Sequence, residues 1–166
     1  MENKDQYFLT NPDKTDKYIE AGNIHPSDTV LELGAGKGTI SERMPHCRHL
    51  YLNDLDEDLC KLLRHRFGMH SHIDILEMDA MDLLKDLDAE KIFSSLPYTM
   101  TDQLLNILRG KEFRRAVICV KSGTDLTPYQ NDFDMEKVEH LNGEDFSPKQ
   151  PYDSDVWLLR KKKDIA

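Results

Sequence analysis

The sequence has no apolar run approaching the ~20 residues that a helix needs to cross a bilayer. It also has no basic excess: 22 Lys and Arg stand against 31 Asp and Glu, giving a net charge of -9. A freestanding protein that binds nucleic acid tightly usually carries a basic surplus. The polar opening Met1–Gln6 predicts that no signal peptide is present. These absences favour a cytoplasmic protein with no membrane partner.

Cysteine is scarce as well. The three cysteines are scattered without Cys-x-x-Cys spacing, which predicts reduced thiols: Cys47, Cys60 and Cys119. Cys119 lies in an apolar run and is interpreted as a small core residue. The histidines at 65, 70 and 72 fall around a helix end and a loop and are interpreted as surface side chains. No metal site is therefore expected.

What the sequence does have is a regular alternation of strand and helix patterns. Its 166 residues suit one domain, residues 1–166, with a sizeable core. The patterns predict strands over 29–33, 50–53, 73–76, 91–94 and 116–120, and helices over 13–21, 39–44, 57–67, 80–87 and 101–108. Residues 135–141 fit a strand or a short helix, and 156–159 fit a closing strand. This alternation predicts a doubly wound, mostly parallel α/β sheet.

A glycine-rich loop follows the first predicted strand of the sheet. The strand passes through Glu32 and leads to Gly34, Gly36 and Gly38. Glycine allows sharp turns and leaves no side chain between the backbone and a ligand. Thr39 stands where the dinucleotide motif has its third glycine, and the lysine and hydroxyl of a P-loop are missing. The strand, Glu32 and the G-x-G-x-G run are similar to the first motif of methyltransferases that use S-adenosylmethionine (SAM).

The second predicted strand supports a nucleoside ligand. It ends at Asp54, about 20 residues past the glycines, where a carboxylate can bind both hydroxyls of a ribose. Together the two motifs predict binding of a nucleoside-containing cofactor. The alternative interpretation is that Glu32 and Asp54 are helix caps or turn formers.

A third segment, Ser95–Tyr98, ends the fourth predicted strand. Ligands bind at the carboxyl ends of strands in open parallel sheets, so this segment is expected to border the cofactor. Pro97 stiffens the turn, and Tyr98 offers a flat face on which a base can stack. The alternative is a β-turn with a buried tyrosine.

In these motifs the chain resembles the rRNA adenine N6-dimethyltransferases. The resemblance runs through six segments in order: Gln6-Tyr7-Phe8-Leu9, similar to Q-x-F-L; Glu32 to Gly38; Asp54-Leu55-Asp56; Met78-Asp79-Ala80-Met81; Ser95-Leu96-Pro97-Tyr98, where the family has Asn-Leu-Pro-Tyr; and Phe146 to Ser154, similar to F-x-P-x-P-x-V-D-S. It implies a Rossmann-like, SAM-dependent methyltransferase domain with a sheet of the seven-stranded type.

The resemblance also implies site residues. The cofactor-binding set is Gln6, Leu9, Glu32, Gly34, Gly36, Gly38, Asp54, Leu55, Asp79, Ala80 and Ser95. The catalytic set is Ser95, Leu96, Pro97, Tyr98 and Phe146. Within these sets, Gln6 and Leu9 are expected beside the methionine part of SAM, Asp54 at the ribose, Asp79 at the adenine amine, and Phe146 over the target base.

The chain also departs from the family pattern. Ser95 replaces the asparagine, and the hydroxyl is a shorter acceptor. The chain ends at Ala166, before the helical RNA-binding domain that normally follows, so it is interpreted as a truncated form. RNA is therefore expected to bind weakly or with help from a partner protein. The leading function is methylation of an amine nitrogen, on a nucleic-acid base first and on a small molecule or protein second. The alternative is a catalytically silent protein that binds SAM or a partner.

Overall fold

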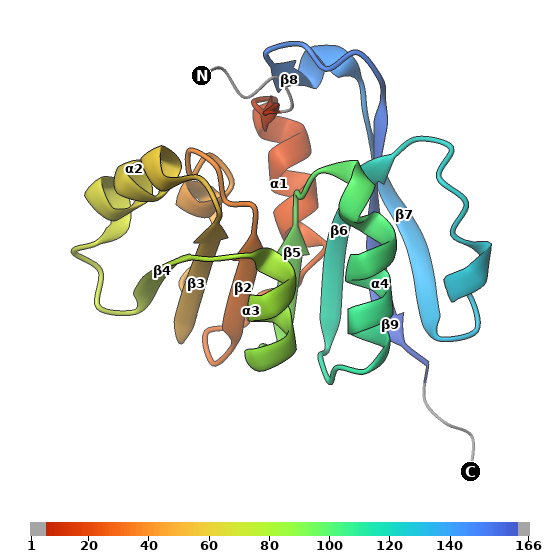
Figure 1. Ribbon diagram of the computed structural model, residues 1–166, viewed down its shortest axis with the longest axis horizontal. Coiled ribbons are helices and arrows are strands. Elements are labelled where there is room, and N and C mark those ends of the chain that lie inside the picture. The colour runs from red at the N-terminus through yellow and green to blue at the C-terminus, as the bar shows by residue number, and fades with distance from the viewer. Residues whose placement is uncertain (1–5, 163–166) are drawn as a thin grey trace.

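The computed structural model describes residues 6–162, which form a twisted sheet with helices on both faces (Figure 1). Within this range the large sheet has seven strands in the order β4-β3-β2-β5-β6-β9-β7. Their bounds are β2 Thr29–Leu33, β3 His49–Asp54, β4 Ile73–Glu77, β5 Lys91–Ser94, β6 Arg115–Lys121, β7 Phe133–Leu141 and β9 Ser154–Lys161. The first five strands in this order, from β4 to β6, run parallel to their neighbours. β9 runs antiparallel to both β6 and β7. The predicted doubly wound, mostly parallel sheet is confirmed.

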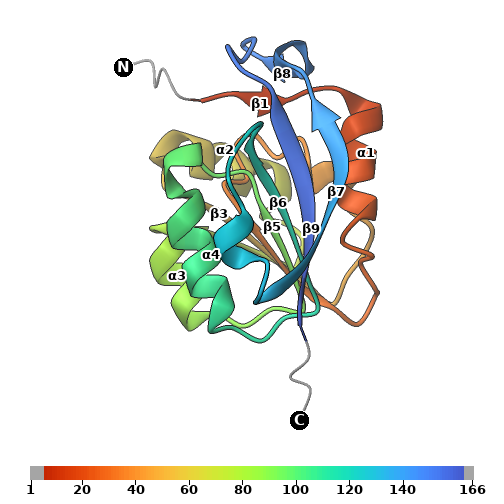
Figure 2. The same ribbon diagram turned by 90° about the vertical axis from the view of Figure 1, so that its right-hand side faces the viewer.

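Two layers of helices cover the sheet. The helices are α1 Pro12–Glu20, α2 Glu57–Phe67, α3 Ala80–Asp86 and α4 Thr101–Arg109. Alternate strand residues face opposite sides, so Val30 packs in the core that α1 and α2 share, whereas Leu31 packs under α3 and α4. Figure 2 shows α1 on one side of the sheet and both α3 and α4 on the other.

Local chemistry sets where the helices begin. The side chain of Asn11 accepts a hydrogen bond from the Lys14 amide, and Pro12 occupies the first turn of α1. Asp56 caps α2 by accepting from the Leu59 amide, and Asp79 caps α3 by accepting from two amides. Such caps satisfy amides that have no partner inside the helix, each stabilising by about 1 kcal/mol.

One sequence prediction changes in the structure, and one open alternative is decided. The predicted helix over 39–44 is wrong in extent: only the 3₁₀ turn Ser41–Arg43 forms, and Pro45 prevents its continuation. Residues 135–141 belong to strand β7 and not to a helix. A separate two-stranded ladder, β1 Phe8–Leu9 with β8 Phe146–Ser147, was not predicted, because two-residue strands carry no periodicity. It places the first described segment beside the segment that leads into β9.

Within residues 6–162 no helix has the length and apolar character needed to span a bilayer. The prediction that no signal peptide is present rests largely on Met1 to Asp5. These residues lie outside the described part of the chain.

Candidate active site

A cavity of about 560 Å³ lies where the loops after β2, β3, β4 and β5 meet β1 and the segment 146–152. Its volume falls within the range of small-molecule sites, and its place at the carboxyl ends of parallel strands is where such sites form. All but two of the predicted site residues line it: Gln6, Leu9, Gly34, Gly36, Asp54, Leu55, Asp79, Ala80, Ser95, Leu96, Pro97, Tyr98 and Phe146.

Close backbone packing joins the glycine loop to the β5 loop. Gly34 has φ +72°, and a Cβ placed there would lie 3.0 Å from the carbonyl oxygen of Ser95. The Ser95 amide donates a hydrogen bond to the Leu33 carbonyl at 3.1 Å. A side chain at Gly34 would be strained and would push the two loops apart, so the sequence needs glycine here.

Glu32 and Gly38 are the two predicted residues that lie outside the cavity lining. Glu32 is only 1% exposed, and the Ser41 hydroxyl donates to its carboxyl oxygen over 2.8 Å. Burial raises the pKa of Glu32 to about 8, which keeps the carboxyl protonated at neutral pH. A Cβ on Gly38 would face the Phe67 ring of α2. Glu32 thus lies beneath the glycine loop, and Gly38 packs that loop against α2, so neither residue lines the cavity.

Asp54 ties the glycine loop to the loop after β3. One carboxylate oxygen accepts the Gly36 amide at 3.0 Å, and the other accepts the Asp56 amide, also at 3.0 Å. Each oxygen keeps a second lone pair that can accept a hydroxyl. Asp54 is thus a turn former, as the alternative interpretation held, and at the same time lines the cavity. Asp79 combines a helix cap with a place in the lining in the same way.

Tyr98 contacts β6 and β9, whereas Ser95 lies between the glycine loop and α1. The Tyr98 hydroxyl lies 2.6 Å from Ser154 Oγ, and its ring centroid is 5.6 Å from that of Tyr152. Burial raises the pKa of Tyr98 well above its usual range, so the phenol stays protonated. Ser95 is exposed and its hydroxyl lies 3.3 Å from that of Tyr18. Phe146 is buried within β8.

Sequence reasoning missed several lining residues, of which Gln150, Tyr152 and Cys119 bear on the chemistry. Gln150 is buried and donates to Ser154 Oγ over 2.6 Å, an inward placement that no local pattern indicates. Tyr152 is an aromatic residue inside a motif already recognised, which is a usable signal. Cys119 is buried in the core cluster, as predicted, and also lines the cavity, with Sγ 3.3 Å from the Tyr98 hydroxyl.

The histidines offer no metal centre in the described part of the chain. Among residues 6–162, no three His, Cys, Asp or Glu side chains are grouped in a way that could hold a metal ion. His65 and His70 are exposed and His72 is half-buried.

The strand order and the cavity define a Rossmann-like methyltransferase fold, which solved structures share. A dimethyladenosine transferase from Plasmodium falciparum superposes with a TM-score of 0.83 at 23% identity, covering 93% of this chain and 63% of that chain. The 23S rRNA methyltransferase ErmE superposes with a TM-score of 0.81 at 20% identity, covering 93% of this chain and 70% of that chain. At these identities the likeness establishes the fold.

Sequence comparison identifies the family. Residues 2–126 match the model of the ribosomal RNA adenine dimethylase family, and the chain belongs to that family. A probable ribosomal RNA small subunit methyltransferase A of Methanosarcina barkeri is 29% identical over 144 residues, which cover 86% of this chain and 47% of that protein. The chain therefore spans about half the length of the curated relatives it matches.

Proposed function

We propose that this chain is a SAM-dependent methyltransferase that acts on an amine nitrogen, with residues 1–166 forming its methyltransferase domain. The observation that carries the proposal is a single cavity that joins the glycine loop and Asp54 to the Ser95–Tyr98 segment. A cofactor and its acceptor would thus share one volume. Family membership supports the same reaction class and the same methyl donor.

The cofactor side fits an adenosyl group with an amino-acid tail. Asp54 keeps lone pairs that would accept the ribose hydroxyls, and Asp79, beside Ala80 in the cavity lining, would accept the adenine amine. Gln6 and Leu9 reach the cavity from the first described segment and would flank the methionine part. Bound here, SAM would supply an electrophilic methyl group on its sulfonium.

On the acceptor side, the task of the protein is positioning. The Ser95 hydroxyl and the Leu96 carbonyl would accept hydrogen bonds from the target amine, and the Tyr98 ring would stack on the target base. Holding the nitrogen lone pair in line with the methyl group supplies much of the rate. The phenol of Tyr98 is not the base, because it stays protonated. Phe146 would pack over the target from β8.

A base in ribosomal RNA is the first candidate substrate, and a small molecule or protein is the second. Relatives named for ribosomal RNA support the first candidate. The net charge of -9 argues that RNA binds this chain weakly or together with a partner protein, and that binding falls as salt rises. A cytoplasmic location agrees with either substrate.

Transfer of label from methyl-labelled SAM to separate pools of ribosomal RNA, protein and small molecules tests the function. Label should enter RNA, and Ser95→Ala should slow transfer while SAM affinity stays unchanged, because Ser95 is proposed to contact the target amine. Asp74→Ala, on an exposed side chain of β4, is the matched control. If the wild type binds SAM but labels no pool, and Ser95→Asn then creates adenine methylation, the chain is a silent member of its family.

A further inference from the structure

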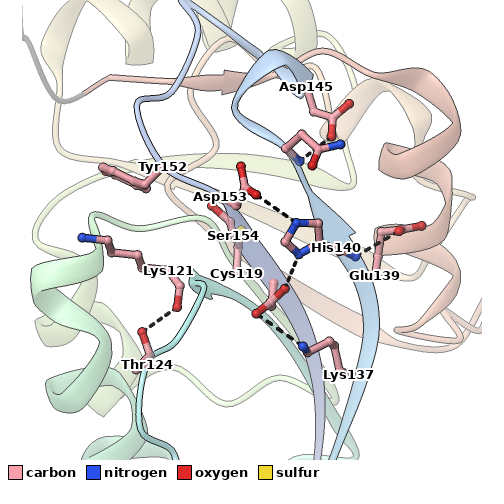
Figure 3. A network of polar contacts seen from close by, with 12 residues as sticks. Cys119, Lys121, Thr124, Lys137, Glu139, His140, Asp145, Tyr152, Asp153 and Ser154 are labelled. Carbon is pink, nitrogen blue, oxygen red and sulfur yellow. Dashed lines mark hydrogen bonds and ion pairs between the residues drawn. The ribbon is translucent and has the colours of Figure 1, made fainter.

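A polar cluster on β7 and β9 adjoins the acceptor side of the cavity. The ladder between β7 and β9 has an irregularity between Lys137 and Glu139. Because a bulge shifts the alternation of side chains, Lys137 and His140 can both reach Asp155. His140 Nδ1 lies 2.7 Å from Asp155, and its Nε2 lies 3.1 Å from Asp153 (Figure 3). Lys137 Nζ is 3.6 Å from Asp155.

This geometry determines the charge of His140. An ionised carboxylate only accepts hydrogen bonds, and a neutral imidazole has a single N–H. Two carboxylates, one on each ring nitrogen, are both satisfied only by the imidazolium. The two aspartates raise the pKa of His140 above its ordinary 6.5. The other charges nearby are Lys137 on Asp155, the Glu139 carboxylate that accepts the His140 amide, and Lys17 of α1, 3.4 Å from Glu139.

The two aspartates flank a residue that holds the cavity wall. Ser154 follows Asp153 and precedes Asp155 in the sequence, and its side chain is fully buried. Its hydroxyl lies 2.6 Å from both the Tyr98 hydroxyl and Gln150 Nε2. Asp153 also accepts the Gly143 amide at 3.2 Å, and its carbonyl accepts the Ser122 amide at 3.0 Å. A shift of Asp153 would therefore move Ser154 and, through it, Tyr98.

We propose that His140 is a positioning residue: its imidazolium clamps Asp153 and Asp155 on either side of Ser154 and so fixes Tyr98 for the target. This rests on the proposed function, because Tyr98 matters only if a target is held there. The clamp is complete below the ordinary pKa of histidine. It is lost as pH rises through the raised pKa, since one N–H disappears and Asp153, the more exposed carboxylate, is released.

The charge state can be measured without any substrate. Trp157 is the sole tryptophan of the chain, lies two residues past Asp155 on β9, and has Lys137 Nζ 5.8 Å from its ring centroid. Its fluorescence should titrate with a midpoint above pH 6.5 in the wild type and not in His140→Gln. His65→Gln, an exposed histidine of α2, should titrate like the wild type. A titration that persists unchanged in His140→Gln would overturn the clamp.

The positioning role needs a second readout. Hydrogen exchange of residues 146–154, corrected for intrinsic pH dependence, should quicken in His140→Gln. Arginine is a permanent cation with several donors. His140→Arg should therefore keep, at high pH as well, the slow exchange that the wild type shows at low pH. Unchanged exchange in both variants would refute the positioning role, whether or not the chain proves to be an enzyme.

Methyl transfer then separates the proposal from the proposed function. With total ribosomal RNA as the probe, His140→Gln at pH 6.5 should raise KM about two- to fivefold, the range for a half-exposed ion pair, with SAM affinity unchanged. His140→Arg should restore KM and remove its rise with pH. Equal KM values in all three proteins would contradict the proposal. Absence of transfer by the wild type would instead count against the proposed function, and exchange and fluorescence would still decide the clamp.

Discussion

The Glu32 carboxyl was expected to contact the cofactor, but it sits beneath the glycine loop with Ser41 as its partner. The sequence shows an acid at the end of a strand and cannot show which way that side chain turns. Burial within β2 decides the matter, because the ionised form would lose its hydration without gaining a cation.

This burial makes stability depend on pH. Glu32 has an ordinary pKa of 4.5 and a pKa of about 8 in the fold, so between these values the folded protein holds a proton that the unfolded chain has released. Stability should then fall as pH rises through this window, by about 1 kcal/mol per pH unit at the steepest. Glu32→Gln, which stays neutral, should flatten this fall when unfolding by urea is followed at pH 5, 7 and 8. Glu57→Gln, on an exposed side chain of α2, should leave the slope unchanged; a wild-type slope in Glu32→Gln would contradict the assignment.

At the scale of elements, apolar patterns predicted six of the seven strands of the large sheet and left 135–141 open between strand and helix. A strand such as β6 is easily found because it is apolar along most of its length. Boundaries moved by one or two residues, as at β3 and β7. The β1 and β8 pair escaped prediction because its partners lie far apart in the sequence and its register, Phe8 opposite Ser147, depends on tertiary contacts.

The glycine loop permits a controlled test of its conformation and packing. Gly38 and Gly123 both have φ +84°, but a Cβ on Gly38 would meet the Phe67 ring at 2.6 Å, whereas nothing lies within 4 Å of one on Gly123. Gly123→Ala should cost about 1 kcal/mol of stability from backbone strain alone. Gly38→Ala should cost more, by the contact with Phe67. Equal losses in urea unfolding would show that the packing below the loop plays no part.

At the scale of the whole molecule, the end of the sheet remote from the cavity is held by a buried ion pair. Lys91 Nζ lies 2.8 Å from Asp28, and their side chains are 6% and 2% exposed. Asp28→Ala would leave a buried ammonium without its counter-charge, so thermal or urea unfolding should show a loss of about 3–5 kcal/mol. Asp88→Ala, which removes an 87% exposed partner of Lys111, should cost less than about 1 kcal/mol. Similar losses of unfolding free energy in the two variants would mean that burial does not make the Lys91–Asp28 pair stronger than the exposed Lys111–Asp88 pair.

The cavity itself shows how far sequence reasoning reaches. Residues on loops after strands, such as Asp54 and Ser95, line one cavity because parallel strands end at a common edge. Gln150 and Tyr152 were missed as site residues because they reach the cavity only after β9 returns beside β6. Motifs therefore indicated residues on the loops after strands, whereas side chains brought in by the antiparallel return escaped them.

The most direct test of the central claim is a calorimetric titration of this chain with SAM. One site per chain should be seen, and Asp54→Ala should weaken it by ~1–3 kcal/mol, because charge-assisted hydrogen bonds are lost. Asp74→Ala should bind SAM as the wild type does, since Asp74 is exposed and pairs with His49 outside the cavity. No heat of binding with SAM, or equal binding of NAD, would contradict the account.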